Sequence, residues 1–293
     1  MIGIDLTGKN AFVTGVADDG GFAWQIAKSL KAAGAKVYLA SHPRTVSIVE
    51  RLLRRAGSAE GRKLPYGVEG EFQPDGLFGC DVAYDTLEDI PEEMRDQKGY
   101  KDQDVSIEGA MNKYTEVSEG APIDILIHCV AFSPEIKNSH LETSRKAYLL
   151  AQSISAYSLI GLSRAALPLM KDREASVVGL SYIAANRMVP GYGGGMASAK
   201  ASLECDSRAM SYYLGEHGHR VNIVSAGPYP SRAARSVGKI DVMVDEAAGK
   251  SPLRRAITAE EVADATLYLC SPLASAVTGT VMYVDCGYHA MGV

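Results

Sequence analysis

The sequence predicts an α/β protein built on a doubly wound parallel sheet, with seven strands and helices on both faces. Short apolar runs alternate with helix-like segments along the chain, an order typical of parallel sheets whose strands are joined by helices. The run Ile123–His128 is almost wholly apolar, as in a strand that is buried on both faces. The chain has 293 residues, 46% of them hydrophobic, and so can bury one large core. We therefore expect residues 1–293 to form a single domain.

Apolar runs and turn residues place the individual elements in order along the chain. The expected strands are Asn10–Thr14, Lys36–Ala40, a run ending at Cys80–Val82, Ile123–His128, Ser176–Leu180, Arg220–Ser225 and Val281–Asp285. The expected helices are Phe22–Ala33, Val46–Arg55, two helical patterns within Glu142–Met170, Ala199–Gly215 and Ala259–Leu269.

Two polar stretches interrupt this alternation. Residues Ala56–Gly79 are rich in glycine, proline and charged residues, and Pro91–Asp104 are similarly polar. The alternation of strands and helices resumes after each stretch. Both are therefore predicted to be surface insertions, after the second and third strands, rather than linkers between domains.

Composition excludes several classes of protein. The formal net charge of −5 argues against a general affinity for nucleic acid or anionic membranes. No apolar run approaches the roughly 18 to 20 residues of a transmembrane span, and the segment Met1–Asp5 carries no export signal. The five cysteines are widely spaced, and His217 and His219 have no further ligand close by in the sequence. This pattern favours free thiols in a reducing cytoplasm and predicts no metal site.

A glycine-rich turn between Val13 and Trp24 joins the first strand to the first helix. Its glycines, Gly15 and Gly21 among them, allow a tight turn and close approach to a pyrophosphate, whose charge the N-terminus of the helix at Phe22 favours. The turn does not match G-x-G-x-x-G, so it also fits an ordinary strand–helix connection. Its position at the start of the first βαβ unit favours nucleotide binding of the Rossmann type. The pair Asp18–Asp19 would repel phosphate, so we expect these side chains to face solvent or cap the helix.

The second strand ends at Ser41–Arg44, where dinucleotide-binding folds often carry an acidic residue for the ribose. No carboxylate is present there. His42 could stack on adenine, and Arg44 could contact a 2′-phosphate or face water. Asp81, after the third strand, could accept a hydrogen bond from the adenine amino group or cap the helix from Thr86 onward.

Tyr192 and Lys200 combine a proton donor with a cation eight residues apart. Many short-chain reductases place such a pair four residues apart on one helical face, but none of the fifteen tyrosines here has a lysine four residues later. Three glycines follow Tyr192, so we expect the tyrosine in a loop and the lysine on the following helix. Tyr182 follows the fifth strand, at the edge where ligands bind in such sheets, and is expected to face the substrate. Ser181 shares that location.

Gly227–Pro228, after the sixth strand, opens a connection that is expected to run as a loop to about Arg255. Small residues in Ser231–Ala234 suit a mobile lid, which we place at residues 229–250. A long surface connection is the alternative. Four apolar residues of the lid could turn toward a ligand: Ile240, Val242, Met243 and Val244.

These residues together resemble the enoyl-acyl-carrier-protein reductases, a divergent branch of the short-chain dehydrogenase/reductase superfamily. The resemblance extends from Gly8 to Val293, and the eight-residue spacing and the Ala56–Gly79 insertion are most similar to the plastid-type members. The matching segments are Thr14–Ala17, Cys80–Val82, His128–Cys129, Leu180–Tyr182, Tyr192 with Lys200, Ser225–Pro228, Ser271–Gly279 and Val284–Gly287. The chain departs from the family at His42, where plastid-type members tend to have tryptophan, and at Tyr229, where an aliphatic residue is usual.

The resemblance implies reduction of a trans-2-enoyl thioester on acyl carrier protein by NADH, the last step of each fatty-acid elongation cycle, in a homotetramer. Tyr192 would hydrogen-bond the thioester oxygen, Lys200 would hold the nicotinamide ribose, and Tyr182 would shape the acyl pocket. The implied cofactor site comprises Gly15, Gly21, Phe22, His42, Asp81, Val82, Cys129, Ala131, Leu180, Lys200, Gly227, Pro228, Tyr229 and Ser231.

Two other functions share these features. A carbonyl reductase or alcohol dehydrogenase would have the same fold, although the missing Tyr-x-x-x-Lys argues against it. A catalytically silent nucleotide-binding scaffold is disfavoured because Tyr192 and Lys200 are both present. The residues alone leave NADH and NADPH open, with Arg44 leaning toward NADPH, and the resemblance favours NADH.

Overall fold

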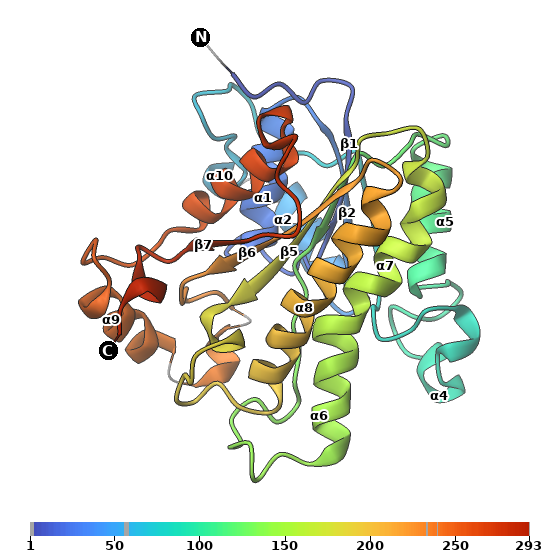
Figure 1. Ribbon diagram of the computed structural model, residues 1–293. Helices are drawn as coiled ribbons and strands as arrows, with labels where there is room; N and C mark the ends of the chain where they lie inside the picture. Colours follow the sequence, from blue (N-terminus) through green and yellow to red (C-terminus); the bar gives the residue numbers. More distant parts are fainter. Residues whose placement is uncertain (1–2, 56–58, 233, 239, 293) are drawn as a thin grey trace.

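A computed structural model describes residues 3–55, 59–232, 234–238 and 240–292. It contains one seven-stranded parallel sheet in the order β3-β2-β1-β4-β5-β6-β7, which confirms the predicted fold class (Figure 1). The strands are β1 (Asn10–Thr14), β2 (Lys36–Ser41), β3 (Gly76–Gly79), β4 (Ile125–His128), β5 (Ser176–Tyr182), β6 (Arg220–Ala226) and β7 (Val281–Val284).

Helices cover both faces of the sheet (Figure 1). One apolar core lies between the sheet and α1, α2 and α10, and a second lies between the sheet and α5, α7 and α8. The helices are α1 (Phe22–Ala32), α2 (Val46–Arg54), α3 (Ala59–Arg62), α4 (Glu92–Arg95), α5 (Ile107–Val117), α6 (Arg145–Gln152), α7 (Ser158–Ala166), α8 (Met196–Gly215), α9 (Ile240–Lys250) and α10 (Ala259–Cys270). A π-helical turn, Ser153–Tyr157, joins α6 to α7. Within the described residues, no helix is both long and apolar enough to cross a membrane.

Alternation of side chains along the strands builds these two cores. In β1, Ala11 and Val13 enter the core under α1 and α10, whereas Phe12 between them enters the core under α5 and α7. All five residues of β1 are buried, as are all four of β4. Strands that are covered on both faces therefore have nearly continuous apolar sequences. For this reason most of the strands could be predicted from the sequence.

The third strand was placed wrongly. It was predicted to end at Cys80–Val82, but β3 is Gly76–Gly79, inside the predicted Ala56–Gly79 insertion. This strand is short and begins and ends with glycine, which has low strand propensity. Its place is fixed by pairing with β2, where Ser41 lies opposite Gly79. Cys80–Val82 follow the strand and carry the chain out of the sheet.

Several helices also differ from the predicted ones. Helix α5 was missed, although its buried residues Ile107, Ala110, Met111 and Tyr114 have helical spacing and Ser106 caps its first turn. Helix α8 begins at Met196, three residues earlier than predicted. The connection after β6 was expected to be a loop as far as Arg255, but it contains α9.

Residues 59–75 of the predicted surface insertion are anchored in the fold, whereas residues 56–58 lie outside the described part. Arg62 is buried, and its Nη1 donates to the carbonyl oxygens of Leu52 and Arg55, both at 2.7 Å. Its Nε and Nη2 bind Glu71 Oε2 at 2.9 and 2.6 Å. The insertion thus supplies hydrogen-bond donors to the C-terminal carbonyls of α2, which have no partners within their own helix.

Candidate functional site

The glycine turn after β1 packs against the end of β4. Gly15 has φ of +80°, and a Cβ at this position would lie 2.0 Å from the carbonyl oxygen of Cys129, so no side chain fits there. Thr14 Oγ1 donates to the carbonyl oxygen of Ile127 at 2.9 Å, which ties the two strand ends together. Ala131, another predicted cofactor residue, is exposed two residues beyond Cys129.

The N-terminus of α1 lies at the same edge of the sheet. Gly21 is its N-cap residue, and no side chain accepts a hydrogen bond from the first turn. Asp18, in the preceding turn, does not cap the helix. Its Oδ1 accepts instead from the N–H of Gly20, before the helix begins, at 2.9 Å. The N–H groups of this helix start are therefore available to an anion.

The connection after β6 joins this turn. The ring of Tyr229 lies on the ring of Phe22, with centroids 5.1 Å apart and planes tilted by 35°. Gly227 is fixed by a hydrogen bond from its N–H to the carbonyl oxygen of Val284, at 2.8 Å. Ser231 Oγ accepts from the N–H of Ala234 at 3.1 Å. Phe22 and Tyr229, which are far apart in the sequence and were both predicted to line the cofactor site, are thus in contact.

Asp81 lies at the other end of the candidate cofactor site, beyond β3. It does not cap a helix at Thr86, because Thr86 forms its own capping box with Asp89. Instead, Asp81 Oδ1 accepts from the N–H of Ala83 at 3.1 Å, and Oδ2 lies 3.5 Å from His42 Nε2. Burial acts to raise the pKa of Asp81, but hydrogen bonds from His42, Tyr100 and Ala83 outweigh it and hold the pKa below its ordinary value.

The turn after β2 presents an imidazole ring, that of His42, and an exposed cation, that of Arg44. The N–H of Arg44 donates to His42 Nδ1 at 3.2 Å, which leaves Nε2 of this ring directed at Asp81. The Arg44 guanidinium is exposed and lies 3.4 Å from Gln97 Oε1. Val82, the next predicted cofactor residue, is buried beside Asp81.

Tyr182 and Tyr192 meet at the end of β5. Their ring centroids are 4.9 Å apart with planes at 63°, an edge-to-face contact. Both rings are partly exposed. Burial raises the pKa of each phenol, and for Tyr182 the neighbouring Tyr192 and Tyr288 add to the shift. Both hydroxyls therefore remain protonated and available as hydrogen-bond donors at neutral pH.

Lys200 lies on α8, and Tyr192 lies in the loop before it, which agrees with the predicted placement. Lys200 is buried, and its Nζ donates to the carbonyl oxygen of Leu180 at 2.7 Å. Burial lowers the pKa of Lys200 to about 8, while Cys129 and Glu204 act in the opposite direction. His128, also buried, is kept neutral because burial and the charge of Lys200 lower its pKa to about 3.

Glu204 was not among the predicted site residues. It is buried one helical turn after Lys200, and its Oε1 accepts from Ser181 Oγ at 2.6 Å. This bond ties α8 to the end of β5, directly before Tyr182. The spacing Lys-x-x-x-Glu was visible in the sequence and places both side chains on one helical face.

The loop that carries Tyr192 is held by backbone contacts with Ser133–Asn138, a segment that was not among the predicted site residues. The N–H groups of Gly193 and Gly194 donate to the carbonyl oxygens of Ile136 and Asn138 at 3.1 and 3.0 Å. A Cβ on Gly193 would lie 1.8 Å from the oxygen of Asn138. Only glycine allows the two segments to approach this closely.

Histidine and cysteine provide no metal site in the described part of the chain. No group of three or more His, Cys, Asp or Glu side chains there could hold a metal ion. His217 and His219 stack on each other, with ring centroids 6.1 Å apart.

Comparison with known proteins gives one consistent family. Residues 80–289 match the family model described as enoyl-(acyl carrier protein) reductase. An Arabidopsis thaliana protein, enoyl-acyl-carrier-protein reductase (NADH), chloroplastic, is 44% identical over 293 residues, covering 99% of this chain and 74% of the relative.

Two solved structures agree with this assignment. The Plasmodium berghei enoyl-acyl-carrier-protein reductase with triclosan is 36% identical, with a TM-score of 0.90 and coverage of 97% of this chain and 98% of the other. An Anaplasma phagocytophilum enoyl-acyl-carrier-protein reductase in complex with NAD is 31% identical, with a TM-score of 0.79 and coverage of 100% and 98%.

Substitution of Gly193 by alanine tests the backbone contact that positions Tyr192. The added Cβ would overlap the oxygen of Asn138, so we expect a loss of about 1 to 3 kcal/mol in the free energy of unfolding. In this variant the amide hydrogens at positions 193 and 194 should also exchange faster than in the unmodified protein. The matched control is Gly215→Ala in α8, where no atom lies within 4 Å of the added Cβ. Equal stability of the two variants would contradict the proposed constraint.

Proposed function

The chain belongs to the enoyl-acyl-carrier-protein reductase family, and we propose that it reduces the double bond of a trans-2-enoyl thioester on acyl carrier protein, with NADH as the hydride donor. The observation that carries this proposal is the arrangement of Tyr182, Tyr192 and Lys200 beside the glycine turn and the open N-terminus of α1. It places two protonated phenols and one cation at the edge of the sheet where nucleotides bind.

The cofactor site is proposed to run along this edge. The first turn of α1 would bind the pyrophosphate, with Gly15, Gly21 and Phe22 forming the adjoining wall. Asp81, Val82 and His42 would receive the adenine. The nicotinamide half would lie between Cys129, Ala131, Leu180 and Lys200 on one side and the segment Gly227–Ser231 on the other. When bound there, NADH supplies the hydride and is oxidised to NAD⁺.

Tyr192 is proposed to stabilise the charge that forms on the substrate. As the new C–H bond forms at the β-carbon, the electron pair of the double bond moves toward the thioester oxygen. The phenol of Tyr192 donates a hydrogen bond, and then a proton, to the enolate formed in this way. Tyr182, in edge-to-face contact with Tyr192, fixes the orientation of that ring and lines the acyl pocket. Lys200 holds the ribose hydroxyls, and its positive charge favours the anionic oxygen.

Oxidation of NADH by a crotonyl thioester, compared with oxidation by simple ketones, tests the reaction class. The Tyr192→Phe variant should lose turnover by roughly 10² to 10⁴-fold, because it removes the proton donor, and should keep its affinity for NADH. Tyr182→Phe is the matched control and should retain more activity than Tyr192→Phe. Full turnover by Tyr192→Phe would mean that another group donates the proton. Oxidation of NADH by ketones but by no enoyl thioester would instead indicate a carbonyl reductase.

The pH dependence of kcat/KM for NADH tests the role of Lys200. Its pKa, lowered by burial to about 8, means that the ammonium is present below this pH and is lost as the pH rises through it. We therefore expect kcat/KM to fall above about pH 8. Lys200→Arg remains charged at all accessible pH values, so it should be less active but should lack this fall. Persistence of the same alkaline limb in Lys200→Arg would assign the limb to another group.

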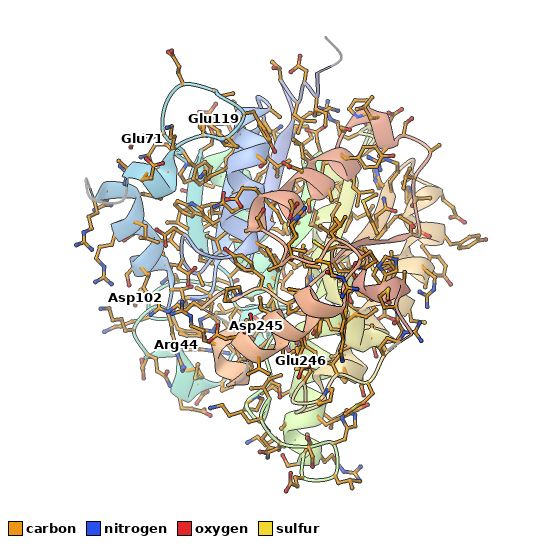
Figure 2. All side chains as sticks on the ribbon, turned by 90° about the vertical axis from the view of Figure 1, so that its left-hand side faces the viewer. Arg44, Glu71, Asp102, Glu119, Asp245 and Glu246 are labelled. Atoms are coloured by element: carbon orange, nitrogen blue, oxygen red, sulfur yellow. The ribbon has the colours of Figure 1, made fainter. Side chains whose placement is uncertain are left out.

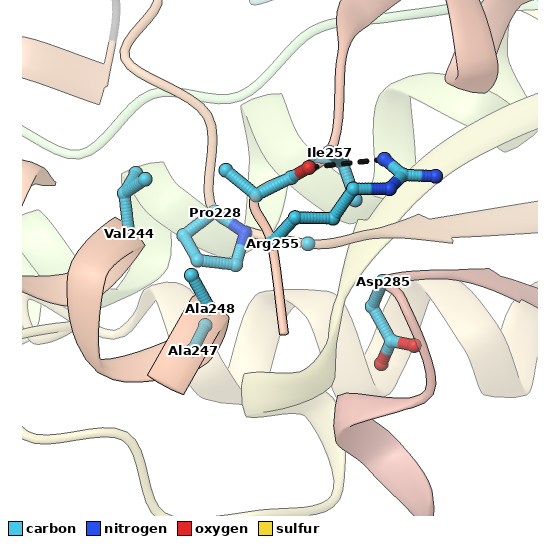
Figure 3. Close-up of a pocket in the computed structure, with 9 residues that line it drawn as sticks. Pro228, Val244, Ala247, Ala248, Arg255, Ile257 and Asp285 are labelled. Carbon is cyan, nitrogen blue, oxygen red and sulfur yellow. Dashed lines mark hydrogen bonds between the residues drawn. The ribbon is translucent and has the colours of Figure 1, made fainter. Parts of the chain in front are cut away.

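Residues 229–250 are proposed to form a lid over the cofactor and substrate, although Ala233 and Lys239 lie outside the described residues. The residues Ile240, Met243 and Ala247 bury one side of α9. Figure 3 shows Val244, Ala247 and Ala248 around a small cavity beside Pro228 and Ile257. Of the four apolar residues expected to face a ligand, Ile240 and Met243 are buried and Val242 is exposed. Asp245 and Glu246, also on α9, are exposed (Figure 2).

Hydrogen exchange tests the lid. Amide hydrogens of α9 should exchange rapidly in the free protein and slowly after NADH and a substrate analogue have bound, because closure adds contacts to a weakly packed helix. Helix α10, packed on α1 in the core, is the internal control and should exchange at the same rate in both states. If α9 is equally protected in both states, it is a fixed wall rather than a lid.

We further propose that the protein is a homotetramer in a reducing compartment. Tyr212 and Tyr213 on α8 and Leu149 on α6 are exposed, and β7 is an edge strand of the sheet in the described part of the chain. Such apolar surface and unpaired strand edges favour contact between copies, and the mass measured by light scattering tests this.

All five cysteines are free thiols, which suits the predicted cytoplasm and equally a plastid, the compartment in the name of the Arabidopsis relative.

A further inference from the structure

Tyr100 lies in Pro91–Asp104, the stretch that was expected to be a surface insertion. Its side chain is 2% exposed, and it forms a small core with Ile90 and Val105, against which Tyr84 packs. Its hydroxyl donates to Asp81 Oδ2 at 2.6 Å. This is a buried hydrogen bond to a carboxylate, which is stronger than one between neutral groups.

The ring of Tyr100 also contacts His42. The two rings pack edge to face at 77°, with centroids 6.4 Å apart, and the Tyr100 hydroxyl lies 3.5 Å from His42 Nε2. Tyr100 therefore touches both residues that the sequence proposed for adenine, one for hydrogen bonding and one for stacking.

The segment around Tyr100 is fixed on the turn that follows β2. A Cβ at Gly99 would lie 2.8 Å from the carbonyl oxygen of Pro43, so the two backbones are in direct contact. Gln97 lies within 3.4 Å of the Arg44 guanidinium, and its own carbonyl oxygen accepts from the N–H of Tyr100 at 2.9 Å. The backbone that carries Tyr100 is thus held against the turn after β2 by the residues that directly precede it.

Asp81 retains free acceptor capacity beside these bonds. Each carboxylate oxygen has two lone pairs: Oδ2 accepts from Tyr100 and also lies 3.5 Å from His42 Nε2, whereas Oδ1 accepts only from the N–H of Ala83 among the described residues. A further donor, such as the amino group of adenine, can therefore bind without displacing the Tyr100 hydroxyl. Because Ala83, Tyr100 and His42 contact its two oxygens, the carboxylate cannot rotate freely toward solvent.

We propose that Tyr100 is a positioning residue for the adenine end of NADH: its hydroxyl holds the Asp81 carboxylate in the orientation that accepts the adenine amino group. This inference rests on the proposed function, because Asp81 meets adenine only if NADH binds along this edge. It gives the Pro91–Asp104 stretch a role in cofactor binding that its polar sequence does not indicate.

The experiment compares NADH with deamino-NADH, in which an oxo group replaces the adenine amino group. Dissociation constants are measured by titration calorimetry for the unmodified protein, Tyr100→Phe and Tyr84→Phe. The unmodified protein should prefer NADH by about 10-fold, the value of one hydrogen bond to a charged group. Tyr100→Phe should reduce this preference to about 3-fold or less, mainly by weakening the binding of NADH. Tyr84→Phe, which removes a neighbouring hydroxyl that has no hydrogen bond to Asp81, should leave the preference unchanged.

Three results would overturn the inference, and they have different meanings. If Tyr100→Phe weakens both cofactors by the same factor, Tyr100 only stabilises the fold, and the proposed function stands. If Tyr100→Phe binds NADH more tightly, the hydroxyl competes with adenine for Asp81. If the unmodified protein shows no preference and Asp81→Ala binds NADH as well as it does, adenine lies elsewhere and the proposed cofactor site fails too.

Discussion

The contact between Gly193–Gly194 and the segment Ser133–Asn138 is the constraint on which the candidate site depends. It is a backbone-to-backbone contact, because a Cβ on Gly193 would lie 1.8 Å from the oxygen of Asn138. Ser133 Oγ adds a hydrogen bond to the carbonyl oxygen of Gly194 at 2.7 Å. The loop before α8 is thereby joined to the loop after β4, and Tyr192 is carried to the end of β5. The eight-residue spacing from Lys200 follows, since the glycine segment must pass this contact before α8 can begin.

Tyr192 and Lys200 therefore have separate supports. The tyrosine depends on the glycine loop, whereas the lysine depends on α8 and on its hydrogen bond to the carbonyl oxygen of Leu180. Burial disfavours the charged form of both groups, and so it shifts their pKa values in opposite directions. It raises the pKa of the phenol, which stays neutral, and lowers the pKa of the ammonium to about 8, near the pH at which the enzyme would work. Glu204 limits that second shift because its negative charge favours the protonated lysine.

The fold could be predicted where burial alone determines the pattern. Strands β1 and β4 are buried on both faces and read as apolar runs, and the glycine turn at Gly15 marks the first strand–helix connection. Strand β3 could not be found in this way, because its glycines carry no apolar signal and only pairing with β2 fixes it. The same limit applies to the site. Glu204 shares a helical face with Lys200 and was detectable by spacing, whereas Tyr100 is 19 positions from Asp81 in a polar stretch, and its contact with Asp81 exists only in the folded chain.

The two ends of the candidate cofactor site are built from different kinds of segment, and this separates affinity from chemistry. At the nicotinamide end, Tyr182 and Lys200 are held by β5 and α8, which also form the core, and Tyr192 is held by the glycine loop before α8. At the adenine end, Asp81 and His42 are held by Tyr100, whose small core is distinct from the two main cores under the sheet. A change in the Pro91–Asp104 stretch can therefore alter how tightly the cofactor binds without disturbing Tyr182, Tyr192 or Lys200. Sequence differences in this stretch are accordingly expected to act on the affinity for the cofactor rather than on the rate of the chemical step.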